Sequence, residues 1–258
     1  MNNNHDFTEG EILRPMLTFR GPVLLAMFLQ SLYGAVDLMV VGKFAEAADA
    51  SGVNTGSQVM MMLTFVVTSF SMAVTILMGQ HIGEKSPEKA GDVIGTGIIM
   101  FAIMAIAMTF AGVIFAPEIA AGLKAPRDAF NQTVSYIRVC SSGFVFIIAY
   151  NVMSGVFRGV GDSVMPLISV TIASVFNIIG DLFFVKGMGM GAKGAAIATV
   201  MAQVISVILS MFIISKRKMP FILTKDKLRI DKSIAKRIFS LGTPLLLQDI
   251  LVSVSFLF

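Results

Sequence analysis

Long apolar segments separated by short polar ones run along the whole chain and restrict what it can fold into. Each of the first six has about the 20 residues that an α-helix needs to cross a bilayer core. Barrel strands are excluded, because they are shorter and alternate in polarity. The sequence therefore predicts an all-α polytopic membrane protein with spans at Leu17–Val41, Asn54–Gly79, Val93–Ala116, Thr133–Phe157, Leu167–Val185 and Gly194–Ser215, and a shorter seventh segment, Leu241–Phe258.

The composition supports a membrane protein and excludes other classes. The chain is 55% hydrophobic and 14% charged, with a mean hydropathy of +0.82, whereas soluble domains carry about 25% charged residues. The net charge of +4 does not indicate a nucleic-acid partner, because the basic residues gather in one loop. Cys140, the single cysteine, lies in an apolar segment, where a packing role is expected.

The distribution of Lys and Arg predicts the orientation in the membrane. With a cytoplasmic N-terminus, the cytoplasmic segments hold fourteen of these residues and the opposite loops hold five. Nine of the fourteen lie between Lys216 and Arg237. The positive-inside rule therefore favours a cytoplasmic N-terminus, in a multi-pass protein of the plasma (inner) membrane with lipid around it.

The basic loop also marks a predicted domain boundary. Ser233–Gln248 aligns with Glu11–Ala26 at a constant offset, so that Pro244 meets Pro22. A repeat that begins after six spans keeps its orientation in the membrane, which is typical of two-lobed transporters. We expect a six-helix N-terminal lobe at 1–215, a cytoplasmic loop at 216–238 and the truncated start of a second lobe at 239–258.

Polar groups at matched depth in three spans predict a binding site. Asp37, Asp181 and Thr199 each lie four or five residues from the outer end of a span, roughly 6–8 Å below it. Asn177 is four residues before Asp181, so the two share a helix face. A carboxylate inside the membrane costs about 2.5–3.5 kcal/mol, which a bound cation or proton offsets. Oxygen ligands suit a hard cation such as Na⁺, and protonation is the competing possibility.

Each of these residues also has a plainer interpretation. Asp37 alone is compatible with an interfacial helix end, Asn177 with a contact between helices, and Thr199 with a small packing residue. Gln30 and Tyr33 lie on the same span as Asp37 and are weaker candidates for a substrate cavity. Pro22 removes a hydrogen bond in that span, so we expect a bend, either static or moving during transport.

Several separated motifs resemble the multidrug and toxic compound extrusion (MATE) family, over essentially the whole chain. In the first span they are the proline, Gln30, Asp37 and the sequence VGKF. The others are FRGVGDSVMP (157–166), NIIGD (177–181) and GMGAKGAAIAT (189–199). The chain looks like the N-terminal half of such a transporter.

The resemblance implies twelve helices in two lobes and export of cationic or amphipathic compounds in exchange for Na⁺ or H⁺. It implies a cation site of Asp37, Asn177, Asp181 and Thr199, with Gln30 and Asn151 at polar positions of the same cavity. We accordingly expect a monomeric transporter, not an enzyme, with small-molecule substrates, no cofactor and no nucleic-acid partner.

Two other functions compete with the exporter. A flippase of lipids or lipid-linked saccharides, from the same broad superfamily, is expected to have a strongly basic cavity. Arg138 is the one basic residue clearly within a predicted span, which favours the exporter. A six-span protein that dimerises is the third possibility, and the truncated seventh segment argues against it.

Overall fold

The computed structural model describes residues 13–217 and 219–255, and within them the chain is helical, without strands. The all-α prediction is therefore confirmed. The α-helices are α1 (Leu13–Phe44), α2 (Ala47–Gly83), α3 (Pro87–Ile114), α4 (Ala116–Gly122), α5 (Phe130–Ser142), α6 (Phe144–Gly159), α7 (Val164–Asp181), α8 (Gly191–Lys216) and α9 (Lys232–Ser255). A π-helical turn, η1 (Leu182–Gly187), follows α7, and a 3₁₀ turn, η2 (Lys225–Lys227), precedes α9.

Five or six segments of the structure are long and apolar enough to cross a membrane, in agreement with the predicted spans. By length and hydropathy, α1, α2, α3, α8 and the continuous α7–η1 segment can each cross a bilayer, and the bent pair α5–α6 gives a sixth crossing if it forms one span. Large apolar side chains such as Leu24, Phe28, Phe110 and Phe212 are exposed on the outside of the bundle. Such a surface is stable against lipid but not against water.

The fourth predicted span is not one straight helix. The sequence predicts a single helix over Thr133–Phe157, whereas α5 and α6 meet at Gly143 with a bend of 53°. A Cβ atom at Gly143 would lie 2.4–2.6 Å from the methyl groups of Val200 on α8. The glycine therefore lets α8 approach the corner between the two helices.

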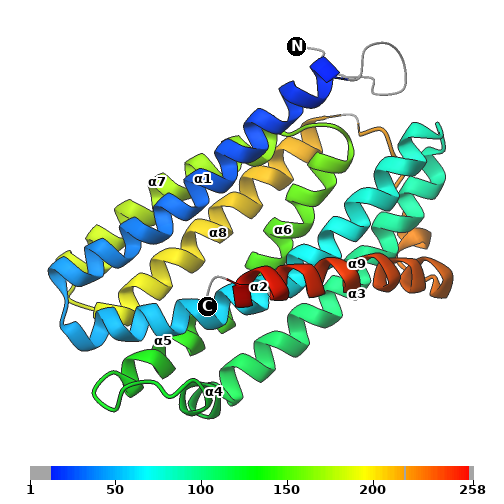
Figure 1. Ribbon diagram of the computed structural model, residues 1–258. Coiled ribbons are helices and arrows are strands. Elements are labelled where there is room, and N and C mark those ends of the chain that lie inside the picture. The colour runs from blue at the N-terminus through cyan, green and yellow to red at the C-terminus, as the bar shows by residue number, and fades with distance from the viewer. Residues whose placement is uncertain (1–12, 218, 256–258) are drawn as a thin grey trace.

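The helices form a bundle in which α1, α7 and α8 lie side by side (Figure 1). On the other side of the bundle, α2 packs against α3, α5 and α6. Gly155 and Gly159 on α6 face α2, where added Cβ atoms would collide with Ser71, Thr75 and Met78. Small residues thus let these helices approach closely, as is usual where lipid supplies no hydrophobic driving force between helices.

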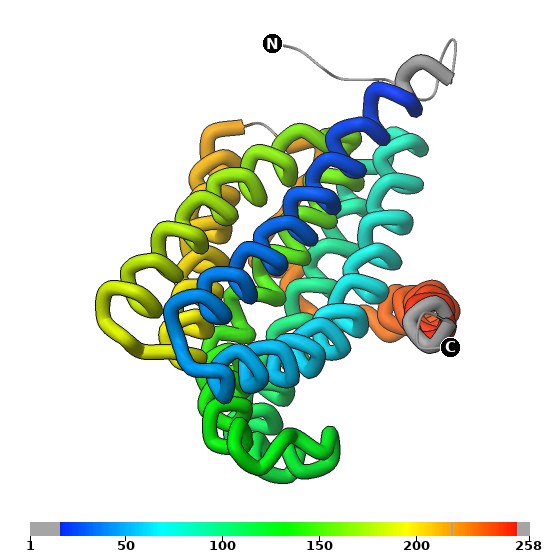
Figure 2. Tube along the Cα trace, turned by 60° about the vertical axis from the view of Figure 1, so that its left-hand side comes forward, coloured from blue at the N-terminus to red at the C-terminus, as the bar shows by residue number. Residues whose placement is uncertain are grey.

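Helix α9 does not run alongside the others. Figure 1 shows it crossing α2 and α3 obliquely, and Figure 2 views it nearly end-on while the bundle helices run across the picture. Phe239 and Gly242 contact Phe70 of α2. α9 begins at Lys232, nine residues before the predicted seventh segment, whose residues 256–258 lie outside the described residues. Whether α9 opens a second lobe stays a prediction.

Candidate functional site

The four predicted ligands come from the three helices that lie side by side. Asp37 is on α1, Asn177 and Asp181 are on α7, and Thr199 is on α8. Asp37 is 5% exposed, and Asn177 and Asp181 are 0% exposed. Asp37 interacts electrostatically with Asp181, while Asn177 and Thr199 line one pocket. The fold therefore gathers residues that are far apart in the sequence.

A close approach of α7 and α8 places Asp181 near Thr199. Gly180 and Ala198, the residues that precede them, lie at the contact, where a Cβ at Gly180 would be 2.9 Å from the Cβ of Ala198. Directly after Asp181 the helix changes to the π form of η1. π-Helical turns are rare and occur frequently at functional sites.

Six polar atoms of these four residues are buried without a hydrogen-bond partner that meets geometric criteria. Among the residues that the structure describes, no group bonds to Asp37 Oδ1, either carboxylate oxygen of Asp181, either amide atom of Asn177, or Thr199 Oγ1. An unsatisfied buried polar group costs about 1–3 kcal/mol. Six such atoms on four residues mark this as a candidate site for a bound ion or proton.

The two carboxyl groups face each other in an environment without compensating charge. Asp37 and Asp181 are each other's electrostatic neighbours. The residues that line the adjoining pocket, all within the described chain, include no Lys or Arg. Two neighbouring buried carboxylates cannot both stay ionised without a counter-charge. Their oxygens, with those of Asn177 and Thr199, fit a hard cation, and either carboxylate can hold a proton.

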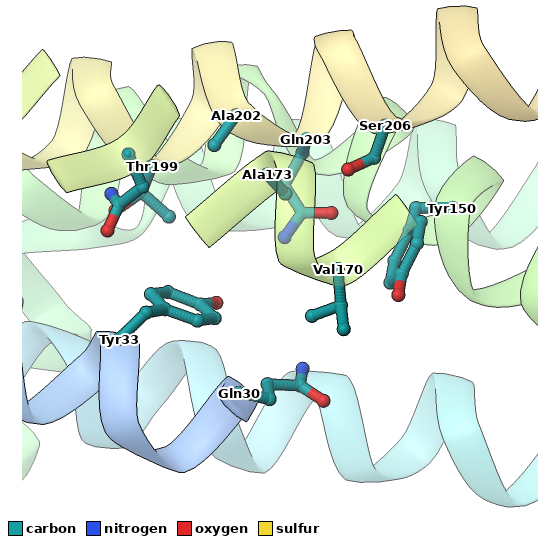
Figure 3. A pocket seen from close by; sticks show the side chains of 10 residues that line it. Gln30, Tyr33, Tyr150, Val170, Ala173, Thr199, Ala202, Gln203 and Ser206 are labelled. Atoms are coloured by element: carbon teal, nitrogen blue, oxygen red, sulfur yellow. The ribbon is translucent and has the colours of Figure 1, made fainter. Parts of the chain in front are cut away.

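A narrow pocket extends from this site along α8 (Figure 3). Its volume of about 10 Å³ is close to the smallest that holds one water molecule, so it suits a monatomic ion rather than a drug. Gln30 and Tyr33 of α1 enter it from the side opposite α8. The lining residues are Gln30, Tyr33, Tyr150, Val170, Ala173, Asn177, Thr199, Ala202, Gln203 and Ser206.

Asn151 lies outside this pocket, on the contact between α6 and α2. Its Nδ2 donates to the carbonyl of Ile147 over 2.8 Å, and its Oδ1 accepts from Thr68 Oγ1 at 3.3 Å. Ser71 Oγ donates to its main-chain carbonyl. Pro22 is also away from the pocket, within α1, which continues as a helix from Leu13 to Phe44.

Sequence reasoning missed three polar residues of the pocket. Gln203 and Ser206 follow Thr199 at intervals of four and three, the spacing of one helix face, so this signal was present in the sequence. Tyr150 enters from α6, and its position depends on the bend at Gly143, which the sequence did not reveal.

Three other charged residues of the helices lie outside the candidate site. Arg138, on α5, is exposed, whereas Arg158 in the last turn of α6 is half-buried and donates to Ser154 Oγ over 3.0 Å. Asp249 on α9 accepts a hydrogen bond from Ser69 Oγ of α2 over 2.9 Å. Asp249 is therefore a partly buried carboxylate outside the candidate site.

The ligand set differs from that of a transition-metal centre. Within residues 16–217 and 219–251, no three His, Cys, Asp or Glu side chains gather as a metal site. Cys140, the single cysteine, is buried and free. Two carboxylates with amide and hydroxyl oxygens are instead the hard ligands that suit alkali and alkaline-earth cations.

A helical bundle with five or six apolar segments long enough to cross a membrane, around two buried carboxyl groups, defines a polytopic membrane protein. The MatE family model matches residues 22–183, which is more than half of the chain. The chain therefore belongs to the MATE family, whose members are multidrug transporters and not enzymes.

Curated relatives carry names that agree with this family. The chain is 27% identical over 259 residues to the probable multidrug resistance protein YoeA of Bacillus subtilis, covering 96% of this chain and 55% of that protein. It is 28% identical over 220 residues to YpnP of the same organism, covering 84% and 49%. The chain thus spans about half the length of the curated relatives it matches.

Solved structures agree with the fold. A crystal structure of MATE in the bent conformation superposes with a TM-score of 0.91 at 22% identity, covering 100% of this chain and 57% of that one. A likeness at this identity establishes the six-helix architecture only.

Proposed function

We propose that this chain forms one six-helix lobe of a two-lobed antiporter that exports cationic or amphipathic compounds in exchange for Na⁺ or H⁺. The family membership and the names of the relatives support multidrug export. The fraction of those relatives that the chain covers supports one lobe of two. The protein acts as a monomer in the plasma membrane, with its N-terminus in the cytoplasm, as its Lys and Arg distribution favours.

One observation supports the coupling role: Asp37 and Asp181 are buried as electrostatic neighbours, and buried polar atoms of Asn177 and Thr199 line the adjoining pocket. A coupling ion that neutralises the two carboxylates stabilises this arrangement, and its release leaves them uncompensated. Ion binding and the packing of α1 against α7 and α8 are therefore linked. Pro22 in α1 is the position at which that helix bends as the site changes occupancy.

The charge of the pocket favours an exporter over a flippase of lipid-linked saccharides. A pyrophosphate group needs basic ligands, whereas the polar side chains that line the pocket, all within the described chain, are amides and hydroxyls. The small volume supports a role for this pocket in ion binding. The larger substrate binds elsewhere, in a cavity to which the second lobe contributes.

Vesicles containing the complete transporter test this function. A sodium gradient and a proton gradient are imposed separately, and efflux of a fluorescent lipophilic cation is recorded. We expect one or both gradients to drive efflux, and the Asp181→Asn variant to respond to neither. Efflux that ignores both gradients would exclude antiport, and a wild-type response in Asp181→Asn would exclude the assigned ion site.

A further inference from the structure

The segment between α8 and α9, residues 219–231, is bound to α3 instead of forming a free linker. The N–H of Ile222 donates to the carbonyl of Pro87 over 3.2 Å. Thr96 Oγ1 donates to the carbonyl of Arg229 over 3.2 Å and accepts from the N–H of Asp231 at 3.3 Å. The α8–α9 segment therefore follows the first turns of α3.

Two glycines of α3 make room for this contact. Gly91 lies against the carbonyl of Ile222, and Gly95, one turn later, lies against the carbonyl of Lys227. A Cβ atom at either glycine would overlap these main-chain oxygens. The side chain of Lys227 returns to α3 and pairs with Asp92, with 3.2 Å between Nζ and Oδ1. The segment is thus held in one orientation, with a defined outer side.

The outer side of the α8–α9 segment carries exposed aliphatic side chains. Ile222, Leu223, Leu228 and Ile230 are 41–47% exposed, whereas Phe221 packs against the buried core. A segment fixed to the protein surface would expose these groups to water at a cost. The apolar side chains therefore indicate that the segment meets something other than bulk water.

Basic residues surround these aliphatic side chains. Lys225 and Arg229 lie within the segment and are exposed. Exposed basic residues also flank it, at Lys216 on the end of α8 and at Lys232, Lys236 and Arg237 on the start of α9. The acidic residues between 216 and 237 are Asp226 and Asp231 alone. The excess of positive charge complements an anionic partner.

The position of the segment indicates that this anionic partner is the lipid surface. Its contacts with α3 extend from Pro87 to Thr96, about 13 Å along a helix that crosses the membrane. This length spans the zone where lipid headgroups give way to hydrocarbon. Exposed aliphatic groups mixed with Lys and Arg at this depth are typical of interfacial membrane anchors.

We propose that the α8–α9 segment is an interfacial anchor that binds anionic phospholipids. Its exposed Lys and Arg side chains contact the headgroup phosphates, and Leu223, Leu228 and Ile230 enter the upper acyl region. Binding fixes the start of α9 relative to α3 at the membrane surface. The anchor rests on the membrane topology and not on the coupling ion, so it stands apart from the proposed antiport.

The absence of tryptophan from the sequence allows a direct test. Leu223→Trp introduces a single reporter into the purified protein, which is reconstituted into vesicles of equal parts phosphatidylcholine and phosphatidylglycerol. In one preparation the acyl chains of phosphatidylcholine are brominated, and in the other those of phosphatidylglycerol. The lipid composition is therefore the same, and only the lipid that carries the bromine quencher differs. We expect a greater loss of fluorescence when the phosphatidylglycerol carries the bromine.

Charge variants show whether the basic residues cause this preference. Adding Lys225→Gln, Arg229→Gln and Lys232→Gln to the reporter should make the two vesicle types quench equally. The matched control, Lys124→Gln, Arg127→Gln and Lys193→Gln, removes the same number of exposed charges at the opposite end of the bundle and should leave the preference unchanged. High salt should reduce the preference, because it screens headgroup attraction.

Three results would overturn the anchor. Equal quenching by both lipids in the unmodified segment would remove the anionic preference. Quenching by aqueous acrylamide without quenching by either lipid would identify a solvated segment. Protection from acrylamide and from both lipids would identify a protein surface as the partner. Leu228→Trp gives an independent reporter should Leu223→Trp disturb the fold.

Discussion

Asp49, near the start of α2, accepts a hydrogen bond from the main-chain N–H of Ala192, with 2.8 Å between Oδ1 and N. The contact ties the first turn of α8 to α2 at the end of the bundle that carries the candidate ion site. Gly191, beside it, has φ of +52°, and a Cβ there would overlap the Asp49 carboxylate. Thr199 is two turns further along α8, so Asp49 fixes the register of the helix that carries it.

Replacing Asp49 should loosen the outer end of α8. Asp49→Ala removes a charged acceptor from a helix N-terminus, and we expect a loss of about 1–3 kcal/mol in the free energy of unfolding. Asp49→Asn keeps an oxygen acceptor and should lose less. Chemical denaturation in detergent measures both variants, and equal losses for Ala and Asn would contradict the role of the hydrogen bond.

Removing either buried carboxylate should abolish coupled efflux. Asp37→Asn and Asp181→Asn each leave one carboxylate that cannot hold the coupling ion as the pair does. In cells that express the complete transporter with either substitution, we expect efflux to fall to the level of cells without the transporter, while membrane insertion stays normal. Drug resistance and the amount of protein in the membrane are measured together.

The control for the carboxylates is Asp128→Asn, which removes an acid from the exposed connection before α5. Its efflux should match that of the wild type, because Asp128 is exposed and does not line the pocket. Normal drug resistance in cells carrying Asp37→Asn or Asp181→Asn would instead show that the pair does not couple transport.

Loss of the Thr199 hydroxyl should weaken ion binding and leave the fold intact. Thr199→Val keeps the shape of the side chain but removes Oγ1, which is buried without a hydrogen bond. If the lost ligand oxygen contributes about 1.4 kcal/mol to the binding free energy of the cation, the cation concentration for half-maximal efflux rises about tenfold. Thr199→Ser keeps the hydroxyl and should remain near the wild type, and an unchanged half-maximal concentration in Thr199→Val would remove Thr199 from the site.

The sequence allowed the crossings and the depth of the polar residues to be predicted, because both follow from distances along single helices. Which helices touch could not be predicted in this way. The contact of α7 with α8 depends on Gly180 and Ala198, and small residues of this kind occur throughout the chain. The matched depths of Asp37, Asp181 and Thr199 therefore suggested a site, and only the packing placed them together.

The bend between α5 and α6 and the course of α9 were missed for a related reason. Thr133–Phe157 has the length and apolar character of one straight span, and the corner at Gly143 exists because Val200 of another helix packs there. The course of α9 depends on its contacts with Phe70 and Ser69 of α2. Contacts between distant parts of the chain leave little trace in local hydrophobicity.

The last prediction concerns the contact that holds the α8–α9 segment on α3. Gly95→Ala places a methyl group where the carbonyl of Lys227 lies, and a main-chain oxygen cannot move away as a flexible side chain can. We expect the segment to separate from α3, so that trypsin cleaves after Lys225 and Arg229 faster than in the wild type. Gly42→Ala is the matched control, because nothing lies within 4 Å of the added Cβ at this helical glycine. Equal cleavage rates in the two variants would show that the fit at Gly95 does not hold the segment on α3.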